Sequence, residues 1–154
     1  MISFKDFYDA YDQAEFGREY GAKAFVNAAE ERILVIPSEM VADKEEIEAA
    51  ETELDSGGWV EFPDQYELHL GQELVFRFAS VHLSPVDCQR VRRIFSRRGA
   101  YGRWKDLLEE HGLLKNWHEF SETEEINALK NWLEEMGIPF TDNPAAGNAG
   151  GAPC

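Results

Sequence analysis

Arginines concentrate in one short segment, and their guanidinium groups are the side chains in this sequence best suited to holding a ligand. Arg90, Arg93 and Arg97 recur at spacings of three and four residues, which places them along one side of a helix. A row of exposed guanidiniums can bind phosphate groups or a carboxylate-rich surface through paired hydrogen bonds. We therefore predict a phosphate-binding or partner-binding surface made of Arg90, Arg93, Arg97, Arg98 and Arg103.

The charge of the chain changes sign around this segment. The 154 residues carry 15 Lys or Arg against 30 Asp or Glu, a formal net charge of −15. Residues 90–118 carry 8 basic against 3 acidic side chains, whereas residues 1–89 carry 6 against 20 and residues 119–154 carry 1 against 7. Three interpretations of the basic segment stay open: internal pairing with the acidic half, contact with nucleic-acid phosphates, and contact with an acidic protein partner.

The acidic half supports an alternative function of a different class. A chain with 20 acids in residues 1–89 could act as a protein–protein interaction module that binds a basic partner, such as an immunity protein, an antitoxin or a nucleic-acid mimic. Such charged interfaces form at low salt and weaken as salt rises.

Catalytic and metal-binding patterns are missing from the sequence. It has no Gly-x-Ser-x-Gly nucleophile elbow, no Walker A loop and no dinucleotide-binding glycine pattern. The histidines, His69, His82, His111 and His118, lack the spacing of zinc ligands. Cys88 falls on the apolar side of its predicted helix, where we expect a small buried hydrophobe. We therefore predict a non-enzymatic binding or regulatory module without a cofactor or metal.

The same sequence predicts a cytoplasmic protein without a membrane partner. No apolar run approaches the roughly 18–20 residues that a membrane-spanning helix needs. Acidic residues also begin at Asp6, so the first residues lack the layout of a signal peptide.

A helix over residues 85–97 must hold the arginine row. Ser84, Pro85 and Asp87 provide a cap residue, a proline at the first helical position and an acid in the first turn. The side opposite the arginines carries apolar residues, namely Cys88, Val91, Ile94 and Phe95. Gly99 ends this helix, and a further helix over residues 100–110 turns Tyr101, Trp104, Leu107 and Leu108 toward a core.

The remaining elements indicate the fold class. Helices are predicted from Ser3 and over residues 43–54 and 70–81, and a last helix follows a capping box at residues 121–124 and ends before Gly137. Short strands are predicted over residues 24–27, 32–37 and 59–63. The result is an α+β fold with a small antiparallel sheet of about three strands and a C-terminal helical cluster. We predict one domain over residues 1–140 and a disordered Gly/Ala/Pro tail over residues 141–154.

Residues 97–120 also resemble a known family. The resemblance rests on short motifs: Gly99-Ala100-Tyr101, then Trp104-Lys105-Asp106, Gly112-Leu113, Trp117 and Phe120. These are similar to the signature of the bacterial uncharacterised protein family 0158. The likeness is specific over residues 97–138 and weak over residues 3–96. Arg97 stands where the family usually has glycine, and His118 where it usually has tyrosine or phenylalanine. The resemblance implies an α+β fold and a bacterial source, and it brings no assigned activity.

Overall fold

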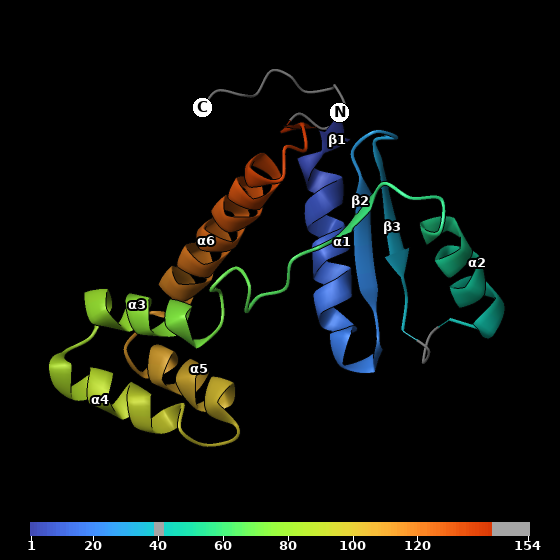
Figure 1. The fold of residues 1–154 in the computed structure, drawn as a ribbon. Helices are drawn as coiled ribbons and strands as arrows, with labels where there is room; N and C mark the ends of the chain where they lie inside the picture. Colours follow the sequence, from blue (N-terminus) through green and yellow to red (C-terminus); the bar gives the residue numbers. More distant parts are fainter. Residues whose placement is uncertain (39–41, 143–154) are drawn as a thin grey trace. The chain divides into compact units, whose positions relative to one another are not determined.

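The computed structural model describes residues 1–38 and 42–142 and shows an α+β fold, as predicted (Figure 1). The described chain divides into two compact units, which are treated separately below. The first comprises residues 1–64 together with the chain from Leu129 onward, and the second comprises Gln65–Ala128. The prediction of one domain over residues 1–140 stays a prediction. The predicted tail lies, from residue 143 onward, outside the described residues.

The first unit contains the sheet. Its elements are β1 (Ile2–Ser3), α1 (Phe4–Phe16), a short 3-10 helix (Arg18–Tyr20), β2 (Lys23–Asn27), β3 (Arg32–Ile36), α2 (Lys44–Leu54), β4 (Trp59–Glu61) and β5 (Phe140–Thr141). The strand order β3-β2-β4 is antiparallel throughout, which confirms the predicted sheet. Helix α1 packs against β2 and β3, and α2 packs against β3 (Figure 1).

The register of the sheet follows from its apolar side chains. Val26 lies opposite Ile33 on β3 and opposite Val60 on β4. Because directly opposed residues share one face of a sheet, these β-branched side chains form an apolar row. Val26, at the centre of the row, is fully buried. A second apolar contact involves α1, where Phe7 stacks on Phe62 with ring centroids 4.2 Å apart.

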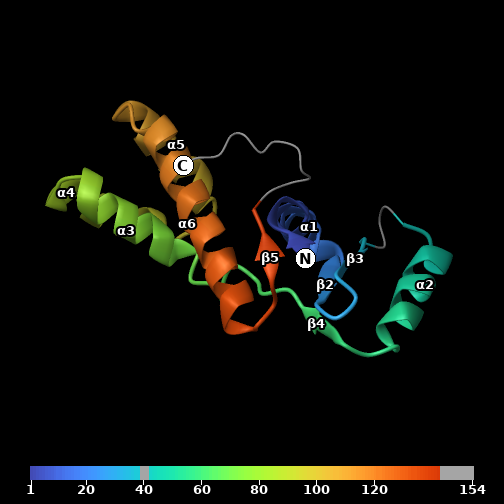
Figure 2. The same cartoon turned by 90° about the horizontal axis from the view of Figure 1, so that it is seen from above.

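A two-residue parallel pair between β1 and β5 was not predicted. It joins the two ends of the described chain, and Figure 2 shows β5 beside the N-terminus. Ile2 lies opposite Phe140 and Ser3 opposite Thr141. Strands of this length are too short to show an alternating pattern, so only the folded chain identifies them.

The second unit is helical. It contains α3 (Gln72–His82), α4 (Pro85–Ile94), α5 (Ala100–Glu110) and the beginning of α6 (Leu114–Glu135). Its core consists of buried residues from α3, from α4 and the residue that follows it, and from α5. Partly buried residues of α6 pack against this core. The buried members are Val75, Phe78, Ala79, Val91, Phe95, Trp104, Leu107 and Leu108.

Two helix boundaries differ from the predictions. Helix α4 ends at Ile94 and not at Arg97, because Phe95 leaves helical geometry and Gly99 takes a left-handed conformation with φ of 75°. Helix α6 begins at Leu114, so residues 121–124 lie inside a helix and do not cap one. The Ser121 hydroxyl donates to the carbonyl oxygen of His118 at 3.2 Å, as serines within helices commonly do.

Candidate phosphate-binding pocket

Helix α4 sets the direction of the arginine row. As predicted, the Ser84 hydroxyl accepts a hydrogen bond from the backbone N–H of Asp87 at 3.2 Å and caps the helix, and Pro85 takes its first position. The opposite side of the helix enters the core, where Val91 is 0% exposed. Because that side is fixed, Arg90 and Arg93 must point away from the core.

The row continues past the end of α4. The backbone N–H of Ser96 donates to the carbonyl oxygen of Arg93, and that of Arg97 donates to the carbonyl oxygen of Ile94 at 3.3 Å. These bonds form a turn directly after α4, and Arg97 lines the same pocket as Arg90 and Arg93.

Four of the five predicted arginines line one pocket. The pocket has a volume of about 320 Å³ and is lined by Arg90, Arg93, Ile94, Ser96, Arg97 and Arg103. Arg103 comes from α5, so two helices contribute guanidiniums to the same concavity. Arg98 is exposed and is not among the lining residues. We call this site the arginine pocket.

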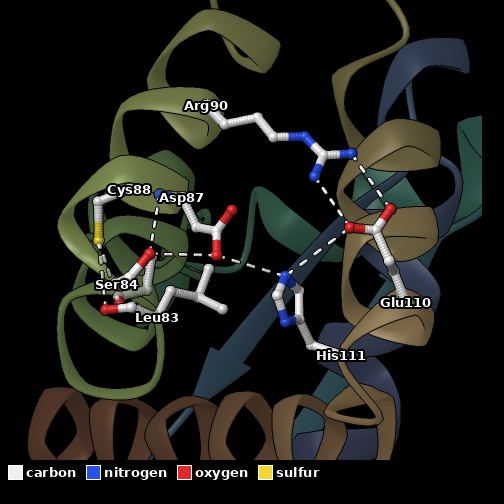
Figure 3. Close-up of polar contacts among 8 residues, drawn as sticks. Leu83, Ser84, Asp87, Cys88, Arg90, Glu110 and His111 are labelled. Atoms are coloured by element: carbon white, nitrogen blue, oxygen red, sulfur yellow. Dashed lines mark hydrogen bonds and ion pairs between the residues drawn. The ribbon is translucent and has the colours of Figure 1, made fainter.

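The residues of the arginine pocket differ in their ionic partners. Arg90 forms a two-pronged pair with Glu110 of α5, with nitrogen–oxygen distances of 2.9 and 3.3 Å (Figure 3). Within the second unit, all of which is described, Arg93, Arg97 and Arg103 take part in no ion pair. The internal-pairing interpretation therefore applies to Arg90, and three guanidiniums of the pocket are left for a ligand.

Pairing shifts the pKa values of both Arg90 and Glu110. The hydrogen bond and the charge of Glu110 raise the pKa of Arg90. The hydrogen bond and the charge of Arg90 lower the pKa of Glu110. Because the carboxyl pKa is lowered in the folded chain, the pair stabilises the fold at neutral pH. That contribution is lost as the pH falls through the lowered pKa.

Replacing Arg90 by glutamine is expected to raise the pKa of Glu110 toward that of an ordinary exposed glutamate, because both the hydrogen bond and the neighbouring charge are removed. NMR titration of the Glu110 side-chain carboxyl carbon measures this shift. Arg92→Gln is the matched control and should leave the pKa of Glu110 in place. An unchanged Glu110 titration in Arg90→Gln would contradict the pairing.

The polar groups beside this pair do not form an activated nucleophile. The Ser84 hydroxyl donates to the Asp87 carboxylate at 3.2 Å, and the same carboxylate lies 3.5 Å from Nε2 of His111 (Figure 3). In a catalytic triad the hydroxyl instead donates to the imidazole. The Cys88 thiol donates to the backbone carbonyl oxygen of Ala79 at 3.3 Å.

The aromatic side chains near the pocket divide between core and surface. Trp104 is 1% exposed and lies at 5.4 Å, edge to face, from Trp117. Tyr101 was expected in the core but is more than half exposed, with its ring edge against Phe95. Its partial burial, and the nearby Tyr66, raise the pKa of the Tyr101 hydroxyl.

Sequence reasoning missed three residues of this site: Ile94 and Ser96, which line the pocket, and Glu110, which holds Arg90. One signal points to Glu110. Arg90 and Glu110 lie roughly equally far from Gly99, and such residues face each other across a helical hairpin. Ile94 was assigned wholly to the core, yet it is only partly buried and forms an apolar part of the pocket wall.

In residues 1–38 and 42–142, no three His, Cys, Asp or Glu side chains come close enough together to hold a metal ion. None of the helices in the same residues has both the length and the apolar character needed to cross a membrane. Comparisons with models of protein families, with curated proteins and with solved structures found no match.

Proposed function

We propose that this chain is a non-enzymatic binding module that contacts nucleic-acid phosphates through the arginine pocket. One observation carries the proposal. Arg93, Arg97 and Arg103 converge on a single pocket without an ionic partner among the residues of the second unit, in a chain that has twice as many acids as bases. The proposal also includes a relation to the bacterial uncharacterised protein family 0158, which the sequence resembles, and a cytoplasmic location, both of which stay predictions.

The chemistry of the pocket supports phosphate as the ligand. Guanidinium is planar and stays charged at all physiological pH values, and its N–H groups match the spacing of phosphate oxygens. Hydrogen bonds between charged partners of this kind are stronger than those between neutral groups. Arginines contributed by both α4 and α5 can surround one phosphate from more than one side.

The net charge of −15 sets the expected strength of binding. The acidic remainder of the chain repels a polyanion, so only local contacts at the pocket favour the complex. We therefore expect modest affinity that falls steeply with salt. For single strands, each neutralised phosphate contributes roughly −0.7 to the slope of log K against log salt concentration.

The test compares two double variants with identical charge. Arg93→Glu/Arg97→Glu reverses two pocket arginines, whereas Arg92→Glu/Arg98→Glu reverses two neighbouring arginines that do not line the pocket. Fluorescence anisotropy of a labelled single-stranded oligonucleotide, measured at about 50 and about 200 mM salt, reports binding. We expect the pocket variant to lose at least about tenfold in affinity and the control to keep most of it, because phosphate contacts act at close range.

Two results would contradict the proposal. If the two double variants lost affinity equally, net charge and not the pocket would govern binding. If the wild-type chain gave no salt-sensitive anisotropy change, the binding function itself would be rejected. Circular dichroism of each variant establishes that the helices are intact before binding is compared.

A further inference from the structure

The arginine pocket is small and open to solvent, and its size restricts the kind of phosphate that it suits. Its volume of about 320 Å³ lies at the lower end of the range for small-molecule sites, roughly 300–1,000 Å³. A protein that follows a nucleic-acid backbone instead spreads its cations along a groove, which spans about 4–16 nucleotides in single-strand binders. Four arginines around one concavity suit one concentrated charge better than a row of separated charges.

The number of pocket arginines that have no ionic partner within the second unit narrows the choice of phosphate further. Arg90 already holds the carboxylate of Glu110 through two hydrogen bonds, so three pocket guanidiniums are left for a ligand. A terminal phosphate presents three acceptor oxygens and a charge of about −1.5 to −2 near neutral pH. An internal phosphodiester has two non-bridging oxygens and a single negative charge. The terminal phosphate therefore matches the three guanidiniums in oxygen count and comes closer to balancing their charge than a phosphodiester does.

Glu110 affects the net charge that the pocket presents to a ligand. Its carboxylate belongs to the same cluster of charges, because it is bonded to Arg90, which lines the pocket. A fixed negative charge at this position repels every anionic ligand. Arg90 offsets this charge, so the net positive charge of the pocket comes from Arg93, Arg97 and Arg103. In a net positive field a dianion gains about twice the Coulomb attraction of a monoanion.

We infer that the arginine pocket binds a phosphate monoester, such as the 5′-phosphate end of a nucleic acid or a nucleoside monophosphate, in preference to an internal phosphodiester. This inference rests on the proposed function and specifies its ligand. The sequence predicted contact with nucleic-acid phosphates in general, and the three guanidiniums at one small pocket narrow this to a terminal group.

The experiment compares oligonucleotides of one sequence, labelled at the 3′ end, that carry either a 5′-phosphate or a 5′-hydroxyl. A third probe has a 5′-hydroxyl and is lengthened by about two nucleotides, so that it matches the total charge of the phosphorylated probe. We expect the phosphorylated probe to bind at least about tenfold more tightly than either of the others, a factor that corresponds to one strong contact. Arg93→Gln/Arg97→Gln should remove this preference, and Arg92→Gln/Arg98→Gln should keep it.

A competition arm separates the two sources of the monoester. If a nucleoside 5′-monophosphate displaces the phosphorylated probe at a concentration near the dissociation constant of that probe, the phosphate group alone carries the affinity and a free nucleotide is the ligand. If displacement needs a large excess of the nucleoside monophosphate, the ligand is a nucleic-acid end. Either result supports the inference, provided that the phosphorylated probe is preferred.

Failure of this inference and failure of the proposed function give different results. If all three probes bind equally and Arg93→Glu/Arg97→Glu abolishes binding of each, the pocket binds backbone phosphate and the monoester preference is wrong. If none of the probes binds the wild-type chain, the proposed function fails as well.

Discussion

Replacing Phe78 by alanine is expected to lower the free energy of unfolding of the second unit by about 3–5 kcal/mol. Phe78 is fully buried, and its ring contacts Trp117 and Phe120 at centroid distances of 5.4 Å each. Truncation removes the ring and leaves a cavity among aromatic side chains that cannot all move inward to fill it. Urea unfolding followed by tryptophan fluorescence measures the loss.

Val81→Ala is the control for Phe78→Ala. Val81 lies on the same helix, α3, but is 75% exposed, so its truncation should change the stability by less than about 0.5 kcal/mol. Peptide-resolved hydrogen exchange should locate the effect of Phe78→Ala in residues 65–128. Equal stability of the two variants would contradict the position of Phe78 in this core.

This prediction also connects the core to the proposed ligand. Val91 of α4 belongs to the same buried cluster as Phe78, and burial of Val91 is what turns Arg90 and Arg93 outward. Phe78→Ala should therefore lose oligonucleotide binding at the urea concentration at which residues 65–128 unfold. Below that concentration the folded fraction should bind as the wild type does, because Phe78 does not line the pocket.

The parts of the site that the sequence predicted are those that local chemistry determines. The serine cap and Pro85 set the start of α4, and the apolar spacing of Val91 and Phe95 set its buried side. The direction of Arg90 and Arg93 follows from these two facts. The strands of the sheet were equally predictable, because their β-branched residues and bounding turns are local signals.

The parts that could not be predicted depend on contacts between distant segments. Arg103 joins the pocket only because α5 folds back along α4, and Glu110 reaches Arg90 for the same reason. The parallel pairing of β1 with β5 joins residues at opposite ends of the described chain. The spacing of apolar residues within one segment does not indicate which distant segment it will contact.

The predicted start of α6 is wrong because side-chain packing outweighs a local capping sequence. Residues 121–124 have the composition of a capping box, yet the helix already runs from Leu114. Trp117 and Phe120 pack against the buried cluster of the second unit, which favours helical geometry before Ser121. Packing of an apolar face contributes more to a helix than a single cap does, so the helix continues through the capping sequence.

Replacing Phe7 by alanine is expected to destabilise the first unit by about 3–5 kcal/mol. Phe7 is fully buried on α1. Its ring stacks on Phe62 at 4.2 Å and on Trp132 at 5.9 Å, so it connects the helix, the segment after β4 and the end of α6. Urea unfolding, with hydrogen exchange of the β2 and β3 amides to locate the change, measures the effect.

The same substitution elsewhere on α1 provides a closely matched control. Phe16 ends α1 and is 93% exposed, so Phe16→Ala removes the same atoms from the same helix without opening a cavity. We expect its stability to stay within about 0.5 kcal/mol of the wild type. A loss in Phe16→Ala as large as that in Phe7→Ala would show that burial does not account for the effect, since alanine has the higher helix propensity and cannot cause a loss by itself. The expected difference between the two variants therefore isolates the contribution of the buried aromatic stack.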